Sequence, residues 1–320
     1  MFGKFKTLKR KLGFLVSRSK FLMSFARKVN LMLFHWDKRQ QDRSFGPLNP
    51  SLRFYIIRPS GFDEGLLSLY LGTVRHVHRC LDEGFVPVVD WQNYVTQYNV
   101  DFPVNGTRNA WEYYFGQPCS YTLDEVYRSR NVRLSGWSLR NIAPPPVSNI
   151  TYKMAEVMPV KEYIQKFAQE KIASGRIEDM IGVLARGTDY TKLKPAGHPI
   201  APSPEMLSAK IDEFLKIYGD RKIFLATEDT EIYSFFSKKY GGLIYSTDNN
   251  LIGSYSGRDY IAQEISPQNR YKFGLDYLVK MICLSRCKCL IAADTAGSRF
   301  ARLLNNGHYA GEYVFSLGVY

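Results

Sequence analysis

The sequence predicts an α/β protein in which two Rossmann-like domains with parallel sheets face each other, preceded by a basic amphipathic helix. After Leu52, apolar segments of strand length alternate with longer segments that have helical periodicity. This alternation is typical of parallel sheets with right-handed crossovers. A chain of 320 residues, 45% of them apolar, can bury two cores of about 150 residues each. The expected units are an arm, residues 1–45, and two domains, residues 46–175 and 176–320.

The first domain begins with a strand, a turn at 59–61, a helix and a second strand. Pro87 lies inside that second strand, which is unusual for a central position in a sheet. The stretch that follows, 91–150, is rich in aromatic residues and turns, and the prolines of 143–146 favour a linker there. The expected elements are strands at 54–57 and 85–89 and helices at 66–81 and 161–172.

The second half shows the same rhythm more clearly. Ser203 is a good helix cap and is followed by a proline at the first helical position, and Gly219 and Gly241 suit helix ends. The expected elements are strands at 181–185, 222–226, 243–245 and 289–292 and helices at 203–218, 229–240, 271–284 and 297–304.

The net charge of +13 is concentrated in the arm, where residues 1–36 hold nine cations and no acidic residue. Apolar residues recur there every three or four positions, which favours a helix lying on an anionic membrane surface, each cation adding about 1 kcal/mol. A mitochondrial presequence and a solvated or cleaved arm are the alternatives. Nucleic acid is not expected as a partner, because the basic residues do not continue through the body. No apolar run reaches the roughly 18 residues that span a bilayer.

Three polar clusters follow strands of the second half. They are Arg186-Gly187-Thr188-Asp189, Thr227-Glu228-Asp229 and Asp294-Thr295-Ala296-Gly297-Ser298-Arg299. Because the carboxyl ends of parallel strands meet at one edge, the clusters predict a phosphate or nucleotide site. The structural alternative is that Thr227 and Thr295 only cap helices. Helix capping does not account for Arg186, a guanidinium directly after an apolar strand and beside a glycine that would let a ligand approach.

Other candidate residues have one functional and one structural interpretation. His198 lies in a loop rich in glycine and proline and suits acid–base chemistry. Trp111, in an aromatic run, could stack on a sugar, although such aromatics more often belong to a core. Gly61, Asp63 and Gly65 form either an ordinary turn or a close approach to substrate.

No motif requires a metal or a bound cofactor. The sequence contains no phosphate loop, no dinucleotide-binding glycine fingerprint, no nucleophile elbow and no Asp-x-Asp pair after a strand. Cys283, Cys287 and Cys289 are interpreted as core residues rather than zinc ligands. Five cysteines, an odd number, favour a reducing compartment.

The motifs resemble those of the fucosyltransferase-like superfamily of GT-B glycosyltransferases, which includes α1,6-, α1,2- and protein O-fucosyltransferases. The family's His-x-Arg-x-x-Asp stretch is similar to residues 184–189, its Ala-Thr-Asp-Asp strand end to residues 226–229, and its Ser-Ser-x-x-x-Arg turn to residues 294–299. The glycine-rich opening of the family's first domain is similar to Ser60-Gly61 and Gly65. The resemblance covers residues 52–310.

The resemblance implies a GT-B fold with an acceptor-binding first domain and a second domain that binds the nucleotide-sugar donor. It also implies an inverting, metal-independent transfer of fucose from GDP-fucose to a cell-surface glycan or a lipid-linked oligosaccharide, as in bacterial polysaccharide biosynthesis. Arg186 would hold the donor diphosphate, and Thr295 and its neighbours would contact the nucleotide. Attachment through residues 1–36 would then place the enzyme on the cytoplasmic face of the cell membrane.

The chain departs from the family pattern at four positions. Leu184 replaces a guanine-binding histidine, Gly187 replaces a second arginine, and Lys280 lies where α1,6 enzymes have a guanine-binding aspartate. Lys194 lies where the animal α1,6 enzymes have a proposed catalytic glutamate. The general base is therefore sought at Asp189 or His198, with Asp189 preferred.

Three other functions are compatible with the sequence. The protein could use another nucleotide sugar, could be a metal-dependent hydrolase or phosphotransferase, or could be a basic membrane- or nucleic-acid-binding scaffold. The interpretation as a glycosyltransferase requires Arg186 to face the space between the domains. It fails if the side chain lies away from that space, held in an internal ion pair.

Overall fold

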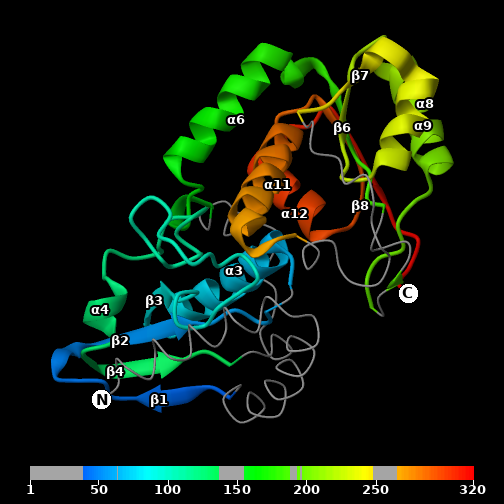
Figure 1. Ribbon diagram of the computed structural model, residues 1–320. Helices are drawn as coiled ribbons and strands as arrows, with labels where there is room; N and C mark the ends of the chain where they lie inside the picture. Colours follow the sequence, from blue (N-terminus) through cyan, green and yellow to red (C-terminus); the bar gives the residue numbers. More distant parts are fainter. Residues whose placement is uncertain (1–38, 63, 137–154, 188–192, 195–196, 248–264) are drawn as a thin grey trace.

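The computed structural model describes residues 39–62, 64–136, 155–187, 193–194, 197–247 and 265–320. They form two separate sheets covered by helices (Figure 1). Residues 1–38 of the expected arm, the linker at 143–146 and the candidates Asp63, Thr188 and Asp189 lie outside the described residues. Within the described ranges, no helix combines the length and the apolar character needed to cross a bilayer.

The first sheet has the strand order β1-β4-β2-β3. β2 (Leu48–Ile57) pairs in parallel with β3 (Val86–Val89) and β4 (Ser129–Leu134), whereas β1 (Gln41–Arg43) runs antiparallel to β4. α3 (Leu66–Asp82) connects β2 to β3, and the short α4 (Leu123–Val126) precedes β4. Pro87 is tolerated because β3 is an edge strand.

The second sheet is entirely parallel and has the order β7-β6-β5-β8-β9. Its strands are β5 (Ile181–Leu184), β6 (Ile223–Ala226), β7 (Ile244–Tyr245), β8 (Cys289–Ala293) and β9 (Gly311–Phe315). Its helices are α8 (Pro204–Tyr218), α9 (Thr230–Tyr240), α11 (Arg270–Ser285) and α12 (Ala296–Asn305). The first strand, β5, lies at the centre. β6 and β7 are added on one side of it and β8 and β9 on the other, so the strand order has a switch point between β5 and β8, as in Rossmann sheets.

The α/β class with parallel sheets is confirmed, and each expected strand and helix in the described ranges is present. Observed ends differ from the expected ones by a few residues, most at β2, which starts at Leu48 rather than Phe54. β1, β4 and β9 were not expected. α6 (Glu162–Gly175), assigned to the first domain, packs against α11 of the second half, as Figure 1 shows.

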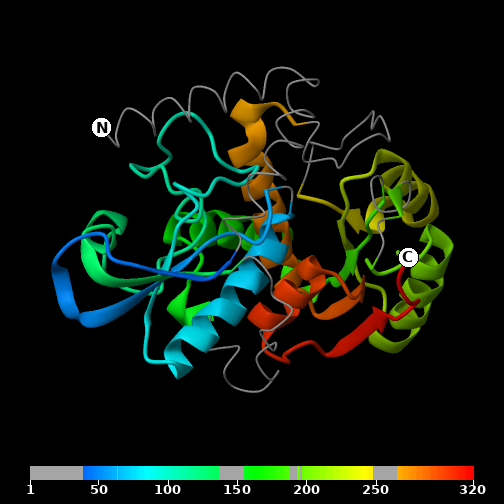
Figure 2. The same ribbon diagram turned by 90° about the horizontal axis from the view of Figure 1, so that it is seen from below.

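A continuous apolar cluster joins the two halves. The Tyr70 ring of α3 lies edge-on to the Phe300 ring of α12, with centroids 5.1 Å apart. Gly274 of α11 packs so closely on Tyr98 and Tyr114 that an added Cβ would lie 2.5 Å from the Tyr114 hydroxyl. α3 and α12 accordingly lie side by side in Figures 1 and 2. The joint is therefore made of interlocked aromatic rings.

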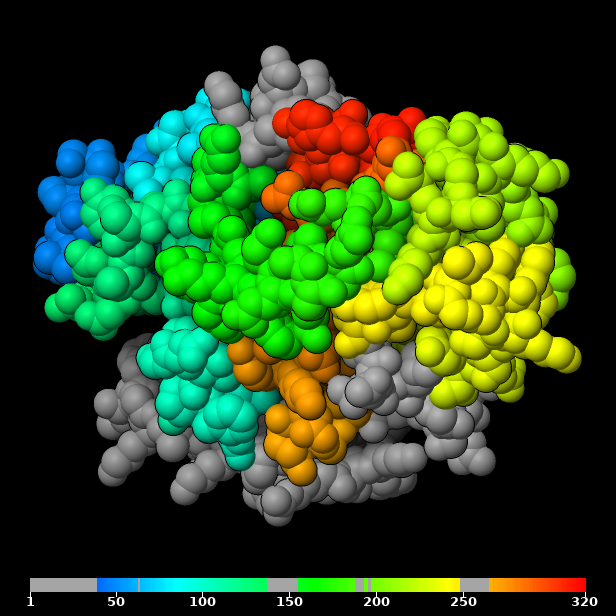
Figure 3. Space-filling model, turned by 90° about the horizontal axis from the view of Figure 1, so that it is seen from above, coloured from blue at the N-terminus to red at the C-terminus, as the bar shows by residue number. Residues whose placement is uncertain are grey.

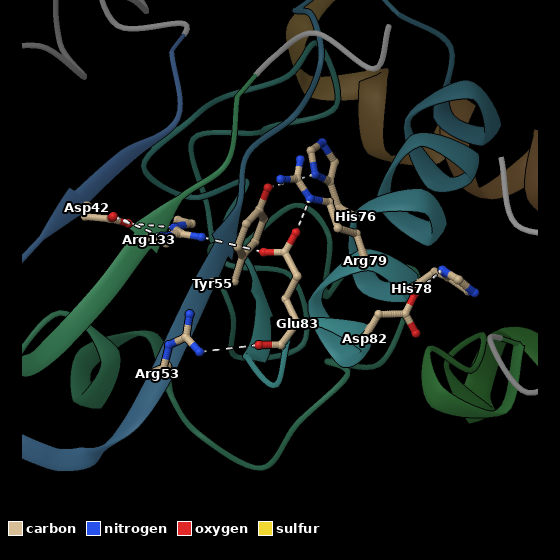
Figure 4. Close-up of polar contacts among 9 residues, drawn as sticks. All are labelled: Asp42, Arg53, Tyr55, His76, His78, Arg79, Asp82, Glu83 and Arg133. Atoms are coloured by element: carbon tan, nitrogen blue, oxygen red, sulfur yellow. Dashed lines mark hydrogen bonds and ion pairs between the residues drawn. The ribbon is translucent and has the colours of Figure 1, made fainter. Parts of the chain in front are cut away.

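A polar network fastens the end of α3 to the first sheet (Figure 4). Arg79 donates to Glu83 at 2.6 Å, and a guanidinium nitrogen of Arg133 lies 3.5 Å from the other Glu83 oxygen. Beside it, Nδ1 of His76 lies 3.2 Å from the Tyr55 hydroxyl. His76 is 3% exposed, and burial lowers its pKa to about 4, with Arg79 and Arg58 adding to the effect.

We expect His76 to make the fold less stable in mild acid. Below pH 6.5 the unfolded chain takes up a proton that the folded imidazole does not bind until about pH 4, so stability falls as the pH decreases through this window, by about 3 kcal/mol in total. In urea unfolding at a series of pH values, His76→Gln should remove this slope. Thr73→Ala changes a buried residue of the same helix that does not titrate, and it should shift all values alike. An unchanged slope in His76→Gln would contradict the assignment.

Candidate active site

The register of the second sheet brings the predicted clusters to one edge. Leu184 of β5 lies opposite Ala226 of β6 and Ala292 of β8. The residues that follow these strands therefore leave the sheet side by side. The convergence expected from the sequence is present for Arg186, Glu228 and Asp294.

Arg186 and Glu228 form an ion pair at this edge. Nε of Arg186 lies 3.3 Å from Oε1 of Glu228, and the two side chains are 19% and 17% exposed. Burial raises the pKa of Tyr98, and the positive charge of Arg186 opposes that rise, so the guanidinium lies near a residue of the first half. The Tyr98 hydroxyl accepts a hydrogen bond from the Leu66 amide at the start of α3, at 2.7 Å. Arg186 is therefore in an internal ion pair with Glu228, and its charge also acts on the Tyr98 hydroxyl of the first half.

Several predicted donor-binding residues have local structural roles. Asp229 caps α9 by accepting from the amides of Glu231 and Ile232. Thr295 and Ser298 form a reciprocal capping box at the start of α12. The Thr227 hydroxyl accepts from the Asp229 amide at 3.2 Å. The capping interpretation is thus correct for Thr295, whereas α9 is capped by Asp229 and not by Thr227. Both helix starts lie at the candidate edge.

The two glycines of the edge are required by packing. A Cβ on Gly187 would clash with the Asp229 carboxylate and with Ile232, and one on Gly297 would meet the hydroxyl of Tyr277. The expectation that Gly187 gives a ligand access to the backbone is therefore corrected: Gly187 is buried, and the space beside it holds a side chain.

Asp294 and Arg299 form a two-pronged ion pair with distances of 2.8 and 2.7 Å. The hydrogen bonds from Arg299 lower the pKa of the Asp294 carboxyl. Both side chains are about half exposed, so a ligand at the start of α12 would meet a pair that is already neutralised.

Lys280 and Tyr277 of α11 also reach the edge and were not selected as site residues from the sequence. Lys280 is 8% exposed, and its Nζ donates to the Thr227 carbonyl at 3.1 Å. Tyr277 and Lys280 are three positions apart and so lie on one face of α11, which was the available signal.

The predicted residues of the first half are divided between a turn and the core. Gly65 immediately precedes α3, with open space where a Cβ would be, and Gly61 lies against the Glu64 side chain. Trp111 is fully buried; its ring stacks on Tyr70, and its indole nitrogen donates to the Gly116 carbonyl at 2.9 Å. The prediction that Trp111 contacts an acceptor is therefore wrong, because the core encloses the whole side chain.

His198 lies in a loop that is tied to the end of the chain. The Tyr320 amide donates to the His198 carbonyl at 3.0 Å, and the Gly197 amide donates to the Tyr320 carbonyl at 2.8 Å. The loop is therefore held by backbone bonds, which position the imidazole without defining its chemical role.

A groove of about 770 Å³ lies between a tight turn of the first half, α6 and α11. Lys161, Tyr163, Tyr271 and Glu112 line it together with the turn at 105–107. The Tyr163 and Tyr271 hydroxyls are 3.1 Å apart. Figure 3 shows the orange surface of α11 next to the teal segment that contains this turn. A second cavity of about 340 Å³, which includes Arg286, lies at the opposite end of β5 and β8.

Metal-binding groups are absent from the part of the chain that the structure describes: it holds no cluster of three His, Cys, Asp or Glu residues. All five cysteines are free, and four are buried. Burial raises the pKa of the Cys283 thiol to about 12. The interpretation of the cysteines as core residues is confirmed.

The strand order and the position of Arg186 define an α/β fold with a parallel sheet and a guanidinium beside the switch point of the strand order. Two crystal structures of fucosyltransferase NodZ from Bradyrhizobium align with this chain, both with a TM-score of 0.51. Their sequence identities are 14% and 13%; the alignments cover 79% of this chain and 93% and 92% of those chains. A structure of POFUT1 in its apo form aligns with a TM-score of 0.42, at 10% identity over 82% of this chain and 98% of that one. No protein-family model and no curated protein sequence matches. The likeness to NodZ shows that the chain shares the α/β fold of those two structures.

Replacing Glu228 by glutamine tests the ion pair. An amide can still contact the guanidinium but no longer competes with an anionic ligand for its charge, so Glu228→Gln should bind GDP several-fold more tightly than wild type in calorimetric titrations. Glu213→Gln removes an acidic residue of α8 that pairs with Lys210, and it should leave GDP affinity unchanged. Weaker GDP binding in Glu228→Gln would instead mean that the carboxylate holds the ligand directly.

Proposed function

We propose that the protein is an inverting, metal-independent glycosyltransferase that transfers fucose from GDP-fucose to a cell-surface glycan or a lipid-linked oligosaccharide. The observation that carries the proposal is the position of Arg186. The guanidinium follows the central strand of a parallel sheet, at the switch point where such sheets bind nucleotides. The fold shared with fucosyltransferase NodZ supports the same class of reaction.

The donor diphosphate would lie between Arg186 and the start of α12. Helix N-termini favour anions, because the amides of the first turn and the helix dipole are positive there. Thr295 and Ser298 hold that turn in place. In the absence of donor, Glu228 orients the Arg186 guanidinium and neutralises its charge. The diphosphate would replace Glu228 as the counter-ion when it binds.

The proposed reaction is a single in-line displacement at the anomeric carbon. An acceptor hydroxyl attacks, a general base takes its proton, and the bond to the diphosphate breaks with the electron pair staying on the leaving group. Negative charge grows on the diphosphate in the transition state, where a fixed guanidinium stabilises it most. Asp189, or else His198, would act as the base.

The acceptor would occupy the groove between the tight turn, α6 and α11. Two tyrosine rings beside a carboxylate and an ammonium group offer both flat apolar faces and hydrogen-bonding groups, as sugar rings require. Glu112 is held in place by the Thr107 hydroxyl at 2.7 Å and by Gln117 at 2.8 Å, so the groove has a preorganised acidic group.

A nucleotide screen followed by one substitution tests the donor assignment. GDP and GDP-fucose, compared with UDP, CMP and their sugars, should raise the melting temperature of the wild-type protein without added metal. Arg186→Ala should abolish this shift and lower kcat/KM at least about 100-fold, which corresponds to about 3 kcal/mol. Arg302→Ala removes an α12 guanidinium that pairs with Glu312 instead, and it should behave like wild type.

Other results of this screen would contradict the proposal. If no nucleoside diphosphate stabilises the protein, the scaffold interpretation gains support. If another nucleotide sugar binds in place of GDP-fucose, the donor is wrong but the reaction class stands. If transfer stops when a chelator is added, the metal-independent mechanism fails.

We also propose that residues 1–36 attach the enzyme to the cytoplasmic face of the cell membrane, on the basis of their nine cations and apolar periodicity. Deleting these residues should abolish sedimentation with vesicles that contain phosphatidylserine. Vesicles of phosphatidylcholine alone should bind neither form strongly, because the attraction is largely electrostatic. Equal binding of the truncated and full chains to anionic vesicles would overturn this attachment.

A further inference from the structure

Arg270, the first residue of α11, is a buried guanidinium that makes no hydrogen bond or ion pair with any residue that the structure describes. It is 8% exposed, and its Nε is enclosed without a partner. Burial lowers the pKa of this guanidinium, and no nearby carboxylate opposes that shift. Burying an uncompensated charge is expensive, so its presence points to a counter-ion that arrives with a ligand.

The surroundings of Arg270 increase the demand for an anion. The positive end of the α11 dipole lies here, and the first turn contains no acidic residue. Asn269, which precedes the helix, makes no capping bond with its side chain. Helix dipole and side chain therefore favour the same ligand charge.

This position is separate from the proposed donor diphosphate. Tyr277 and Lys280, which reach the edge of the second sheet, follow Arg270 by seven and ten residues, or about 10 and 15 Å along the helix. Next to Arg270 is Tyr271, which lines the groove of about 770 Å³. The N-terminus of α11 therefore lies beside the groove and about two to three helical turns from the proposed donor site.

We propose that Arg270 and the N-terminal end of α11 bind an oxyanion group of the acceptor, a phosphate or a carboxylate. The assignment of this group to the acceptor rests on the proposed function. The acceptor is then an acidic glycan or a glycolipid with a phosphate, bound at one end by α11 while its reacting hydroxyl meets the donor at the sheet edge. A neutral acceptor would leave the guanidinium without a counter-ion.

Titrations with inorganic phosphate and with glucuronate, at low ionic strength, test this site. They are carried out on the full chain and repeated in Arg186→Ala, which removes the other proposed anion site. At least one probe should bind, and Arg270→Met should weaken that binding at least tenfold. Arg270→Lys keeps the charge without the two-pronged geometry and should weaken it several-fold. Lys272→Met, the control in the same helical turn, should stay within twofold of wild type, because Lys272 is exposed.

The melting temperature without ligand separates a binding role from a structural one. Replacing an uncompensated buried charge by an apolar side chain of similar length should leave the melting temperature equal or raise it by a few degrees. If Arg270→Met instead melts at a much lower temperature, Arg270 has an ordinary structural role and the proposal is wrong. Binding of neither probe, or equal binding in Arg270→Met, also overturns it.

The two probes identify the source of the oxyanion. Binding of phosphate alone indicates a phosphate-bearing acceptor, and binding of glucuronate indicates an acidic sugar. GDP binding is measured in the same variants. GDP binding should be lost in Arg186→Ala and retained in Arg270→Met. This pattern distinguishes a wrong donor site from a wrong oxyanion site.

Discussion

The parallel register of the second sheet is the constraint on which the candidate active site depends. With Leu184 opposite both Ala226 and Ala292, the chain leaves three strands at the same height. A shift by one residue would turn each strand's buried side chains to the other face. The register is therefore maintained by the core on both faces of the sheet, and the core determines where Arg186, Glu228 and Asp294 meet.

The aromatic joint between the halves has a comparable effect on the first half. Tyr98 and Tyr114 pack against Gly274 of α11. The Tyr98 hydroxyl also accepts a hydrogen bond from the first amide of α3. One tyrosine thus connects the start of α3, the middle of α11 and the neighbourhood of Arg186. Because protein interiors are close-packed, a movement of α11 would be transmitted to these contacts. The candidate donor edge and the groove share this helix and are therefore mechanically linked.

Sequence patterns predicted the elements well where the hydrophobic period was strong, and less well elsewhere. The strands of the second sheet centre are apolar on both faces, which makes them easy to recognise, whereas β4 alternates and contains charged residues and β9 is mostly exposed. The meeting of the three clusters followed from parallel topology alone. Side-chain contacts could not be predicted from the sequence in the same way. The burial of Trp111 in the core and the contact of Gly187 with a carboxylate both depend on packing between segments that are distant in sequence. Arg270 gave no signal, because a missing partner is visible only in three dimensions.

The two guanidiniums illustrate different ways to keep a positive charge ready for a ligand. Arg186 is compensated by Glu228, so the empty site has a small electrostatic cost, and an incoming anion must compete with a carboxylate. Arg270 has no such partner among the described residues, so its burial is uncompensated, and an incoming anion would meet no competing carboxylate. In the proposed sites, affinity at Arg186 would depend on the exchange of one counter-ion for another, and affinity at Arg270 on the relief of a burial cost that the fold already carries. Natural proteins retain such penalties where function requires them, since selection removes only variants whose stability falls below the threshold needed for function.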